Sequence, residues 1–383
     1  MCILIILLNY KYTHEKSDLY EQYYVDGRDI SLVFPEKKRN LIYIYLESME
    51  TTFADKASGG VMESNLMPEL SALALENIDF SESGVLNGAY SPTGTTYTMG
   101  ALVAQTSGVA VNGKPIVDIN EWESENGEYL LPGAWTIGDI LASEGYEQTF
   151  MIGSDGKFAG RSLYFTGHGG YHIKDYYTAL EEGWIPEGYY VWWGYEDTKL
   201  IEFAKKEIVS LADSDAPFNF TMLTVDTHFT DGYVCELCNT ESDVQYDNVI
   251  SCSSRQIAAF VDWIRQQAFY ENTTIVIAGD HPTMDYNYIT EKGVADYDRR
   301  VYVAIINPAE NCKSVERERQ YTTLDLFPTT LAALGVQIPE ERLGLGVNLF
   351  SETPTLYEEY GRAYVNRELL KYSDLYTKKL LYR

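Results

Sequence analysis

The feature that most constrains the fold is a short apolar run, 40–47, which reads Asn-Leu-Ile-Tyr-Ile-Tyr-Leu-Glu. Its apolar residues follow one another without the spacing of three or four that marks one face of a surface helix. Such unbroken runs are typical of a parallel strand that is buried on both faces. Since that strand needs helices on both sides of its sheet, the run predicts an α/β fold.

Comparable apolar runs alternate with helical patterns along the chain. Further strands are expected at 148–152, 218–225, 273–278 and 300–306. Helices are expected at 67–76, 98–106, 136–144, 197–211, 254–270 and 324–334. Alternation of this kind predicts a mostly parallel central sheet with helices on both faces. The 383 residues suffice for one large domain, and no internal repeat or long linker divides them.

The charge balance restricts the partners. The chain has 29 basic and 57 acidic residues, a net charge of −28. Because nucleic-acid binding needs a basic surface, this balance argues against nucleic acid as a partner. A phosphate-containing substrate stays possible, since a divalent metal can supply positive charge locally.

Polar, metal-compatible residues follow three of the predicted strands. They are Glu47, Asp226, His228, Asp280 and His281. In open parallel sheets, ligands bind beyond the carboxyl ends of the strands, so these side chains are expected to converge there. The adjacent carboxylate and imidazole of Asp280 and His281 are ligands that a divalent cation accepts.

A second signal is the hydroxyl-rich segment 91–100, Ser-Pro-Thr-Gly-Thr-Thr-Tyr-Thr-Met-Gly, which leads into a predicted helix. The amides and the dipole at a helix N-terminus favour a bound anion. Helix capping would account for one threonine, but four occur within six positions. A threonine hydroxyl becomes a useful nucleophile when a base or a metal activates it.

These motifs resemble two related families. Glu47 after an apolar strand, Thr-Gly-x-x-x-Thr at 93–98 and Gly-Asp-His at 279–281 look like the extracellular domain of lipoteichoic acid synthases. The resemblance is greater to the phosphoglycerol transferases that decorate periplasmic glucans. Four further segments fit that branch: 155–161, 226–228, 238–252 and 344–351. The resemblance implies the alkaline-phosphatase/sulfatase fold.

The same resemblance implies roles for individual residues. One divalent cation, Mn²⁺ or Mg²⁺, would be held by Glu47, Thr98, Asp280 and His281. Thr98 would be the nucleophile and would form a phosphoglycerol-threonine intermediate. The phosphoglycerol group would be held by Asp155, Arg161 and His228. Arg161 suits this role because its planar guanidinium can bind two phosphate oxygens. His168 and His172 receive no role.

The implied reaction moves the phosphoglycerol headgroup of a phosphatidylglycerol-type lipid to an envelope glycan or polyglycerol-phosphate acceptor. Lipoteichoic acid synthases have a Trp where this chain has Phe-Ala-Gly at 158–160, which favours the glucan-type branch and leaves the acceptor open. Two other functions are kept as alternatives: a phosphoethanolamine transferase, and a non-catalytic glycan-binding or sensor domain. A sulfatase is disfavoured because the sequence lacks a Cys/Ser-x-Pro-Ser-Arg loop.

We expect three parts along the chain: a membrane-proximal stub and stalk (1–39), a catalytic domain (40–351) and a C-terminal extension packed on it (352–383). The apolar start, 3–8, is too short to cross a bilayer, which takes roughly 20 residues. It is either a buried strand or the end of a membrane anchor that this chain mostly lacks. We favour the anchor, with the enzyme on the extracytoplasmic face of the membrane.

Three of the five cysteines, Cys235, Cys238 and Cys252, lie close together in the sequence. The Cys-x-x-Cys pair could be half of a zinc site, but no second pair or His-x-x-x-His completes it. For an extracytoplasmic chain, a disulfide that closes a surface loop is the simpler interpretation, and we expect Cys238–Cys252.

Overall fold

A six-stranded sheet forms the centre of the computed structural model, which describes residues 15–81, 84–112, 129–312 and 318–381. The apolar start at 3–8 lies outside the described residues. The strand order is β3-β2-β4-β1-β5-β6. The strands are β1 (Asn40–Leu46), β2 (Glu147–Ile152), β3 (His172–Lys174), β4 (Phe218–Leu223), β5 (Thr273–Gly279) and β6 (Val303–Ile306). All neighbouring pairs are parallel except β5 with β6, which confirms the predicted fold class.

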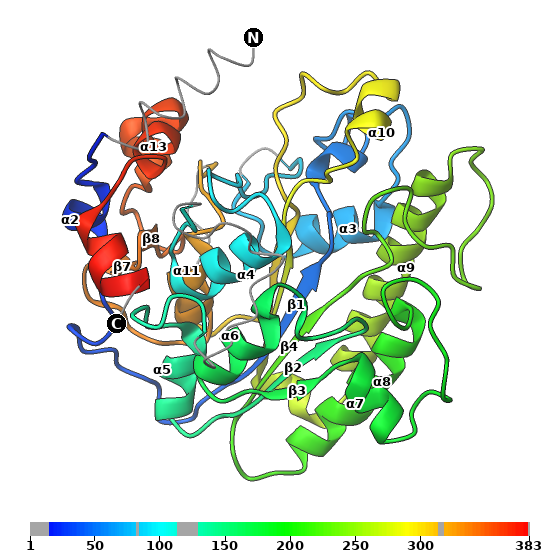
Figure 1. The fold of residues 1–383 in the computed structure, drawn as a ribbon, viewed down its shortest axis with the longest axis horizontal. Coiled ribbons are helices and arrows are strands. Elements are labelled where there is room, and N and C mark those ends of the chain that lie inside the picture. The colour runs from blue at the N-terminus through cyan, green and yellow to red at the C-terminus, as the bar shows by residue number, and fades with distance from the viewer. Residues whose placement is uncertain (1–14, 82–83, 113–128, 313–317, 382–383) are drawn as a thin grey trace.

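Helices lie on both faces of this sheet (Figure 1). The α-helices are α2 (Leu19–Tyr23), α3 (Pro68–Glu76), α4 (Thr98–Ser107), α5 (Ile137–Ser143), α6 (Arg161–Gly167), α7 (Tyr176–Glu181), α8 (Asp197–Ala212), α9 (Gln245–Arg265), α10 (Tyr286–Glu291), α11 (Leu326–Ala333), α12 (Leu356–Tyr360) and α13 (Arg362–Leu369). A small hairpin joins β7 (Arg342–Leu343) and β8 (Gly346–Val347), and a π-helix spans Tyr376–Leu381. Short 3-10 turns lie at Thr51–Phe53, Phe158–Gly160, Ala268–Asn272 and Pro339–Glu341.

Two predicted elements differ from those in the structure, and the edge strand β3 was not predicted. The strand expected at 300–306 is the shorter β6, and it runs antiparallel at the edge of the sheet. The helix expected at 254–270 begins at Gln245 and ends at Arg265. Its first turns contain several polar residues, so the apolar periodicity on which the prediction rested begins too late.

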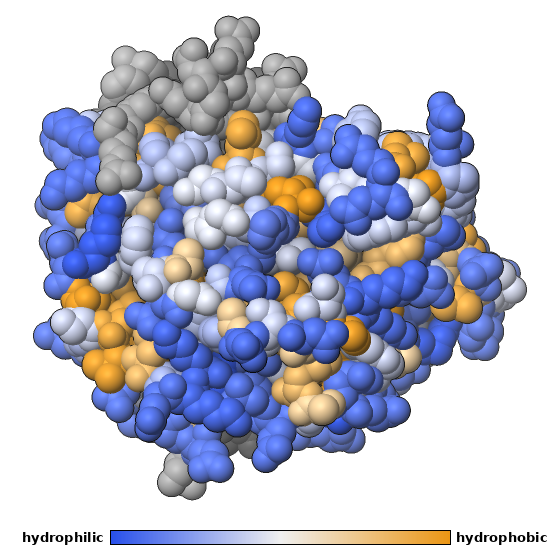
Figure 2. All heavy atoms as spheres, turned by 90° about the horizontal axis from the view of Figure 1, so that it is seen from below, coloured by the Kyte–Doolittle hydropathy of each residue, from blue (hydrophilic) through white to orange (hydrophobic). Residues whose placement is uncertain are grey.

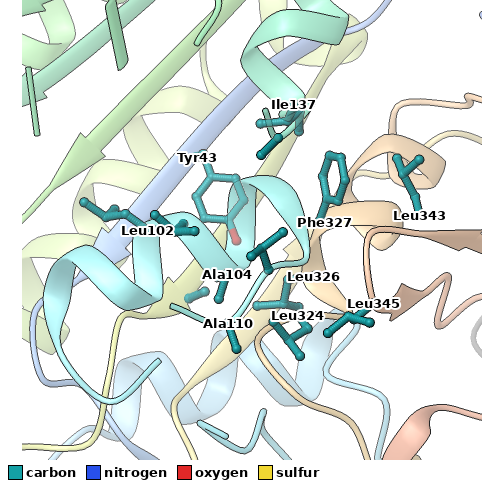
Figure 3. Packing of buried hydrophobic residues seen from close by; sticks show 14 of the residues in the cluster. Tyr43, Leu102, Ala104, Ala110, Ile137, Leu324, Leu326, Phe327, Leu343 and Leu345 are labelled. Carbon is teal, nitrogen blue, oxygen red and sulfur yellow. The ribbon is translucent and has the colours of Figure 1, made fainter. Parts of the chain in front are cut away.

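The central strand β1 divides the core into two. Leu41, Tyr43 and Tyr45 pack into one cluster with α4, α5, α6 and α11, and Figure 3 shows Tyr43 beside Leu102 of α4 in this cluster. The alternate residues of β1 pack on the other side with α3, α8 and α9. Successive side chains of a strand point to opposite faces, so both faces of β1 are buried. This is why its sequence is apolar without interruption.

The surface is mostly polar. On the face shown in Figure 2, hydrophilic residues cover much of the surface and hydrophobic residues form small separate groups. Within the described part of the chain, no helix combines the length and the apolar character that a membrane crossing requires.

Arg319 joins the last part of the chain to the rest. Its side chain is 1% exposed, and its Nε and Nη2 atoms donate to the two carboxylate oxygens of Glu358 at 2.8 and 3.0 Å. The remaining guanidinium bonds go to the backbone carbonyls of Leu349, Ser351 and Thr353. Residues of α12 and α13 share the hydrophobic cluster of α4 and α11, so this polar contact lies beside a common core.

We predict that Arg319→Met lowers the free energy of unfolding by about 3–5 kcal/mol, because it leaves a partly buried carboxylate without its cation. Guanidinium unfolding followed by circular dichroism measures the change. The matched control is Arg367→Met, because the Arg367 side chain is 46% exposed and 3.4 Å from its partner Glu368. That substitution should cost less than about 1 kcal/mol. Equal losses in the two variants would contradict the role assigned to Arg319.

Candidate active site

Three potential metal ligands meet beyond the carboxyl ends of β1 and β5. One ligand atom each from Glu47, Asp280 and His281 lies within 4.8 Å of the others. His281 Nε2 is 3.3 Å from Asp280 Oδ2 and 3.6 Å from Glu47 Oε1. All three residues are buried.

The register of the sheet brings these residues together. Leu46 of β1 pairs with Gly279 of β5, so Glu47 and Asp280 leave neighbouring strands side by side. The turn after β1 then brings the Ser48 amide to Asp280 Oδ1, to which it donates at 2.8 Å. The Ser48 hydroxyl donates to Glu47 Oε1 at 2.7 Å. One turn therefore orients both carboxylates.

The hydrogen bonds of His281 leave its Nε2 atom free to bind a metal. Its Nδ1 lies 3.0 Å from the Pro282 carbonyl oxygen, and a carbonyl can only accept, so Nδ1 carries a proton. Nε2 then faces the two carboxylates. A histidine that binds a metal through one ring nitrogen usually donates a hydrogen bond from the other, as Nδ1 does here to a carbonyl oxygen.

The electrostatics of this cluster favour a cation. Burial, followed by the charge of Glu47, raises the pKa of Asp280 to about 7. Burial works to lower the pKa of His281, but the charges of Asp280 and Glu47 outweigh it and raise the pKa. Asp280 Oδ2 is buried and has no hydrogen-bond partner among the described residues. A buried acceptor in this state is costly, and a divalent cation would satisfy it.

Thr98 is the first residue of α4, and its Oγ1 lies 3.3 Å from His281 Nε2. The amides in the first turn of a helix have no acceptor within the helix, so they can bind anionic oxygens. Gly94 shapes the approach to this turn. Its φ is +88°, and a Cβ atom there would lie 2.4 Å from the Val111 carbonyl oxygen. Only glycine fits at this position in the Thr-Gly-x-x-x-Thr motif.

The other threonines of the motif have different surroundings. Thr95 is buried, and its hydroxyl donates to the Pro92 carbonyl oxygen at 2.9 Å. Thr93 contacts Asn366 Oδ1 through its amide and its hydroxyl. Thr96 is exposed. Of the four, Thr98 is the one that contacts a candidate metal ligand.

Arg161 and Asp155 lie together near the metal cluster. Arg161 begins α6, is buried, and donates to the backbone oxygens of Phe158 and Asp155 at 2.9 and 2.8 Å. These bonds use Nε and Nη2, and Nη1 has no acceptor among the described residues. Burial lowers the pKa of Arg161 to about 10, and the charges of Glu47 and Asp155 oppose this effect. Because β2, β4 and β1 are parallel, the segment after β2 that carries Asp155 and Arg161 leaves the sheet at the same edge as Glu47.

His228 lies in the loop after β4, and an aromatic surface lies beside it. His228 Nδ1 is 2.6 Å from the Phe229 carbonyl oxygen, which again leaves Nε2 available. The ring centroid of Trp193 is 4.7 Å from that of His228 and 5.8 Å from that of Phe158. Trp193 therefore connects the 155–161 segment with His228. The sequence analysis did not identify it, although the aromatic run 189–193 was a signal.

Two further contacts support the site and were not predicted. Arg299 Nε donates to Glu50 Oε2 at 2.8 Å, and Arg299 Nη2 donates to the Thr283 carbonyl oxygen at 2.7 Å. The Tyr246 hydroxyl donates to the Thr227 carbonyl oxygen at 2.7 Å and lies 3.0 Å from Thr283 Oγ1. These contacts join the loops that follow β1, β4 and β5. No local sequence pattern marked these residues, because their partners are distant in the chain.

The remaining histidines and the cysteines lie elsewhere. His168 is buried between Asp139 and the Leu130 carbonyl oxygen, and His172 is exposed in β3. Cys235, Cys238 and Cys252 form a cluster in which all three are free thiols. The structure therefore contains no Cys238–Cys252 disulfide. The two sulfur atoms lie in the same cluster, each 3.7 Å from the sulfur of Cys235.

Comparisons with known proteins agree with this geometry. A family model described as Sulfatase matches residues 39–336. Phosphoglycerol transferase I from Escherichia coli (strain 55989 / EAEC) is 30% identical over 332 residues, which cover 83% of this chain and 40% of that protein. The chain thus spans less than half the length of this curated relative.

Two solved structures have the same fold. The lipoteichoic acid synthase LtaP from Listeria monocytogenes matches with a TM-score of 0.69 at 14% identity, covering 96% of this chain and 99% of that one. A protein in the alkaline phosphatase superfamily from Vibrio parahaemolyticus matches with a TM-score of 0.63 at 19% identity, covering 85% of this chain and 72% of that one. With the family match extending over most of its length, the chain belongs to the sulfatase family and has the alkaline-phosphatase-superfamily fold.

Proposed function

We propose that this chain is a metal-dependent phosphoglycerol transferase with Thr98 as its nucleophile. The observation that carries the proposal is the convergence of a helix-N-terminal hydroxyl with Glu47, Asp280 and His281. The likeness to a phosphoglycerol transferase supports the choice of transferred group. We further propose that the donor is a phosphatidylglycerol-type lipid on the extracytoplasmic face of the membrane. The acceptor would be an envelope glycan or polyglycerol phosphate.

The donor set suits Mn²⁺ or Mg²⁺. Glu47 and Asp280 offer hard carboxylate oxygens, and His281 Nε2 and Thr98 Oγ1 complete the set. When bound, the cation would lower the pKa of the Thr98 hydroxyl and offset charge on the phosphoryl oxygens.

The protein residues then perform the transfer in two steps. Thr98 Oγ1 attacks the phosphorus atom in line, the phosphorus–oxygen bond to diacylglycerol breaks, and a phosphoglycerol-threonine forms. Arg161 Nη1 and the amides at the start of α4 bind the phosphoryl oxygens during this step. Thr98 would attack as the alkoxide, with its proton held on His228 Nε2, and His228 would give that proton to the departing diacylglycerol oxygen. In the second step the acceptor hydroxyl would return a proton to the same nitrogen and attack phosphorus, and the phosphorus–Oγ1 bond would break to release Thr98 as the alkoxide.

The surroundings of the phosphate would select its glycerol group. The Asp155 carboxylate can accept hydrogen bonds from the glycerol hydroxyls, and the ring faces of Phe158 and Trp193 can pack against its carbon atoms. Phe158 is 41% exposed, so it is accessible to a substrate. Arg161 lies over the Phe158 ring with its Cζ atom 5.2 Å from the centroid, which keeps phosphate and glycerol contacts adjacent.

We predict that a chelator abolishes release of diacylglycerol from phosphatidylglycerol vesicles, and that Mn²⁺ or Mg²⁺ restores it. Glu47→Ala should lower the rate by about 100-fold or more, because it removes a ligand from a buried site. The control is Glu63→Ala, which removes an exposed carboxylate and should leave the rate unchanged. Turnover that survives both the chelator and Glu47→Ala would refute metal dependence through this cluster.

We also predict that Thr98→Ala folds normally but loses roughly 10³-fold or more in turnover, because no covalent intermediate can form. A short pulse of substrate followed by peptide mapping should locate an added phosphoglycerol mass on Thr98 in the unmodified chain. Thr96→Ala is the matched control, since Thr96 is exposed two residues before the start of the same helix and should be nearly silent. An added mass on another threonine would overturn the assignment of the nucleophile.

A further inference from the structure

A second cluster of possible metal ligands lies away from the candidate active site. Cys235 and Cys238 belong to the loop between β4 and α9, and Cys252 lies on α9 itself. The Cys235 sulfur is 3.7 Å from each of the other two, and all three sulfurs lie within 4.8 Å of one another. Cys235 and Cys252 are buried, whereas Cys238 is half-buried and gives access from solvent.

The sulfur separations match a metal site better than a disulfide. A disulfide has sulfurs about 2.05 Å apart, and it would leave one of these three thiols unpaired. In a tetrahedral zinc site with Zn–S bonds of about 2.3 Å, neighbouring sulfurs are about 3.8 Å apart. The two separations of 3.7 Å are close to this value, and the third sulfur pair lies within 4.8 Å. Cys-x-x-Cys is also a frequent spacing of paired zinc ligands.

The surroundings of the sulfurs are arranged to support thiolates. Gln256 lies one helical turn after Cys252, and its Nε2 is 3.4 Å from the Cys252 sulfur and 3.6 Å from the Cys235 sulfur. The Thr198 hydroxyl donates to Gln256 Oε1 at 3.1 Å, which turns the amide NH₂ group towards the sulfurs. Donors fixed in this way orient metal ligands and stabilise their charge.

A buried carboxylate near the cluster also lacks a counter-charge. Asp226 is 3% exposed, and neither of its carboxylate oxygens has a hydrogen-bond partner among the described residues. Its amide donates at 3.0 Å to Oδ2 of the buried Asp197, the residue before Thr198. Such an accumulation of buried acidic groups is unfavourable unless a cation lies nearby.

We propose that Cys235, Cys238 and Cys252 form a zinc site that is separate from the catalytic metal centre, with water in the fourth position. Zinc suits this set because thiolates are soft ligands and three of them leave one tetrahedral position open. Its structural effect is to fix the loop after β4 onto α9. His228 lies in the first part of that loop. Tyr246 of α9 also holds the loop, because its hydroxyl donates a hydrogen bond to the Thr227 carbonyl oxygen. The ion therefore stabilises the loop that carries His228.

The proposal predicts bound zinc that does not depend on the catalytic centre. Reduced Glu47→Ala protein, loaded with zinc and desalted, should retain about one zinc ion per chain by mass spectrometry of the metal. In the same background, Cys235→Ser or Cys252→Ser should weaken zinc binding at least about 10-fold. Cys312→Ser is the matched control and should retain the ion, because Cys312 lies outside the cluster. Cobalt loading should give thiolate-to-cobalt charge-transfer absorption in all but the two cluster variants.

A second measurement applies even if the serine variants do not fold. Zinc should protect Cys235, Cys238 and Cys252 of the unmodified chain from alkylation under native conditions, while labelling of Cys312 is unchanged. Equal labelling of the cluster with and without zinc would refute the proposal. It would also be refuted by an intact mass two hydrogens lower in protein that binds no zinc at the cluster, since a disulfide would then occupy these residues. Both outcomes leave the assignment of Thr98 and its metal ligands untouched.

Discussion

The candidate active site depends on the parallel pairing of β1 with β5. With Leu46 opposite Gly279, the next residue of each strand is a carboxylate, and the two carboxylates emerge at the same edge of the sheet. The pairing also needs a glycine at the end of β5, because a Cβ atom on Gly279 would lie 2.0 Å from the Met49 carbonyl oxygen. A shift of one residue would move Glu47 about 3.3 Å along the sheet relative to Asp280 and turn its side chain to the other face.

Close packing of acidic groups makes this edge of the sheet a favourable place for a cation. Burial, followed by the repulsion of the neighbouring Glu47 carboxylate, raises the pKa of Asp280 to about 7. The surrounding hydrogen bonds fix the ligand atoms without neutralising them, as the orphaned Asp280 Oδ2 shows. The fold thus holds the candidate ligands in place without an ion. A bound cation would offset the repulsion between the two buried carboxylates.

The substrate side of the site is built differently. Arg161 begins α6, whereas His228 and Trp193 lie in two separate loops, and ring contacts and backbone hydrogen bonds hold all three in place. Loops can vary while the sheet stays the same, so a shared scaffold can serve different headgroups and acceptors. Trp193 comes from a part of the chain distant from Arg161. It contacts the Phe158 ring, over which Arg161 lies.

The sequence by itself determined five of the six strands of the central sheet, all except β3, and the polar residues at the ends of β1, β4 and β5. Burial on both faces produces an uninterrupted apolar run, which is a local pattern, and Glu47, Asp280 and His281 directly follow such runs. Only the tertiary structure decided the direction of β6, the contact of Trp193 with His228, the link from Arg299 to Glu50 and the meeting of Cys252 with Cys235. Each of these joins residues whose pairing depends on how the chain packs, and no local periodicity encodes that packing.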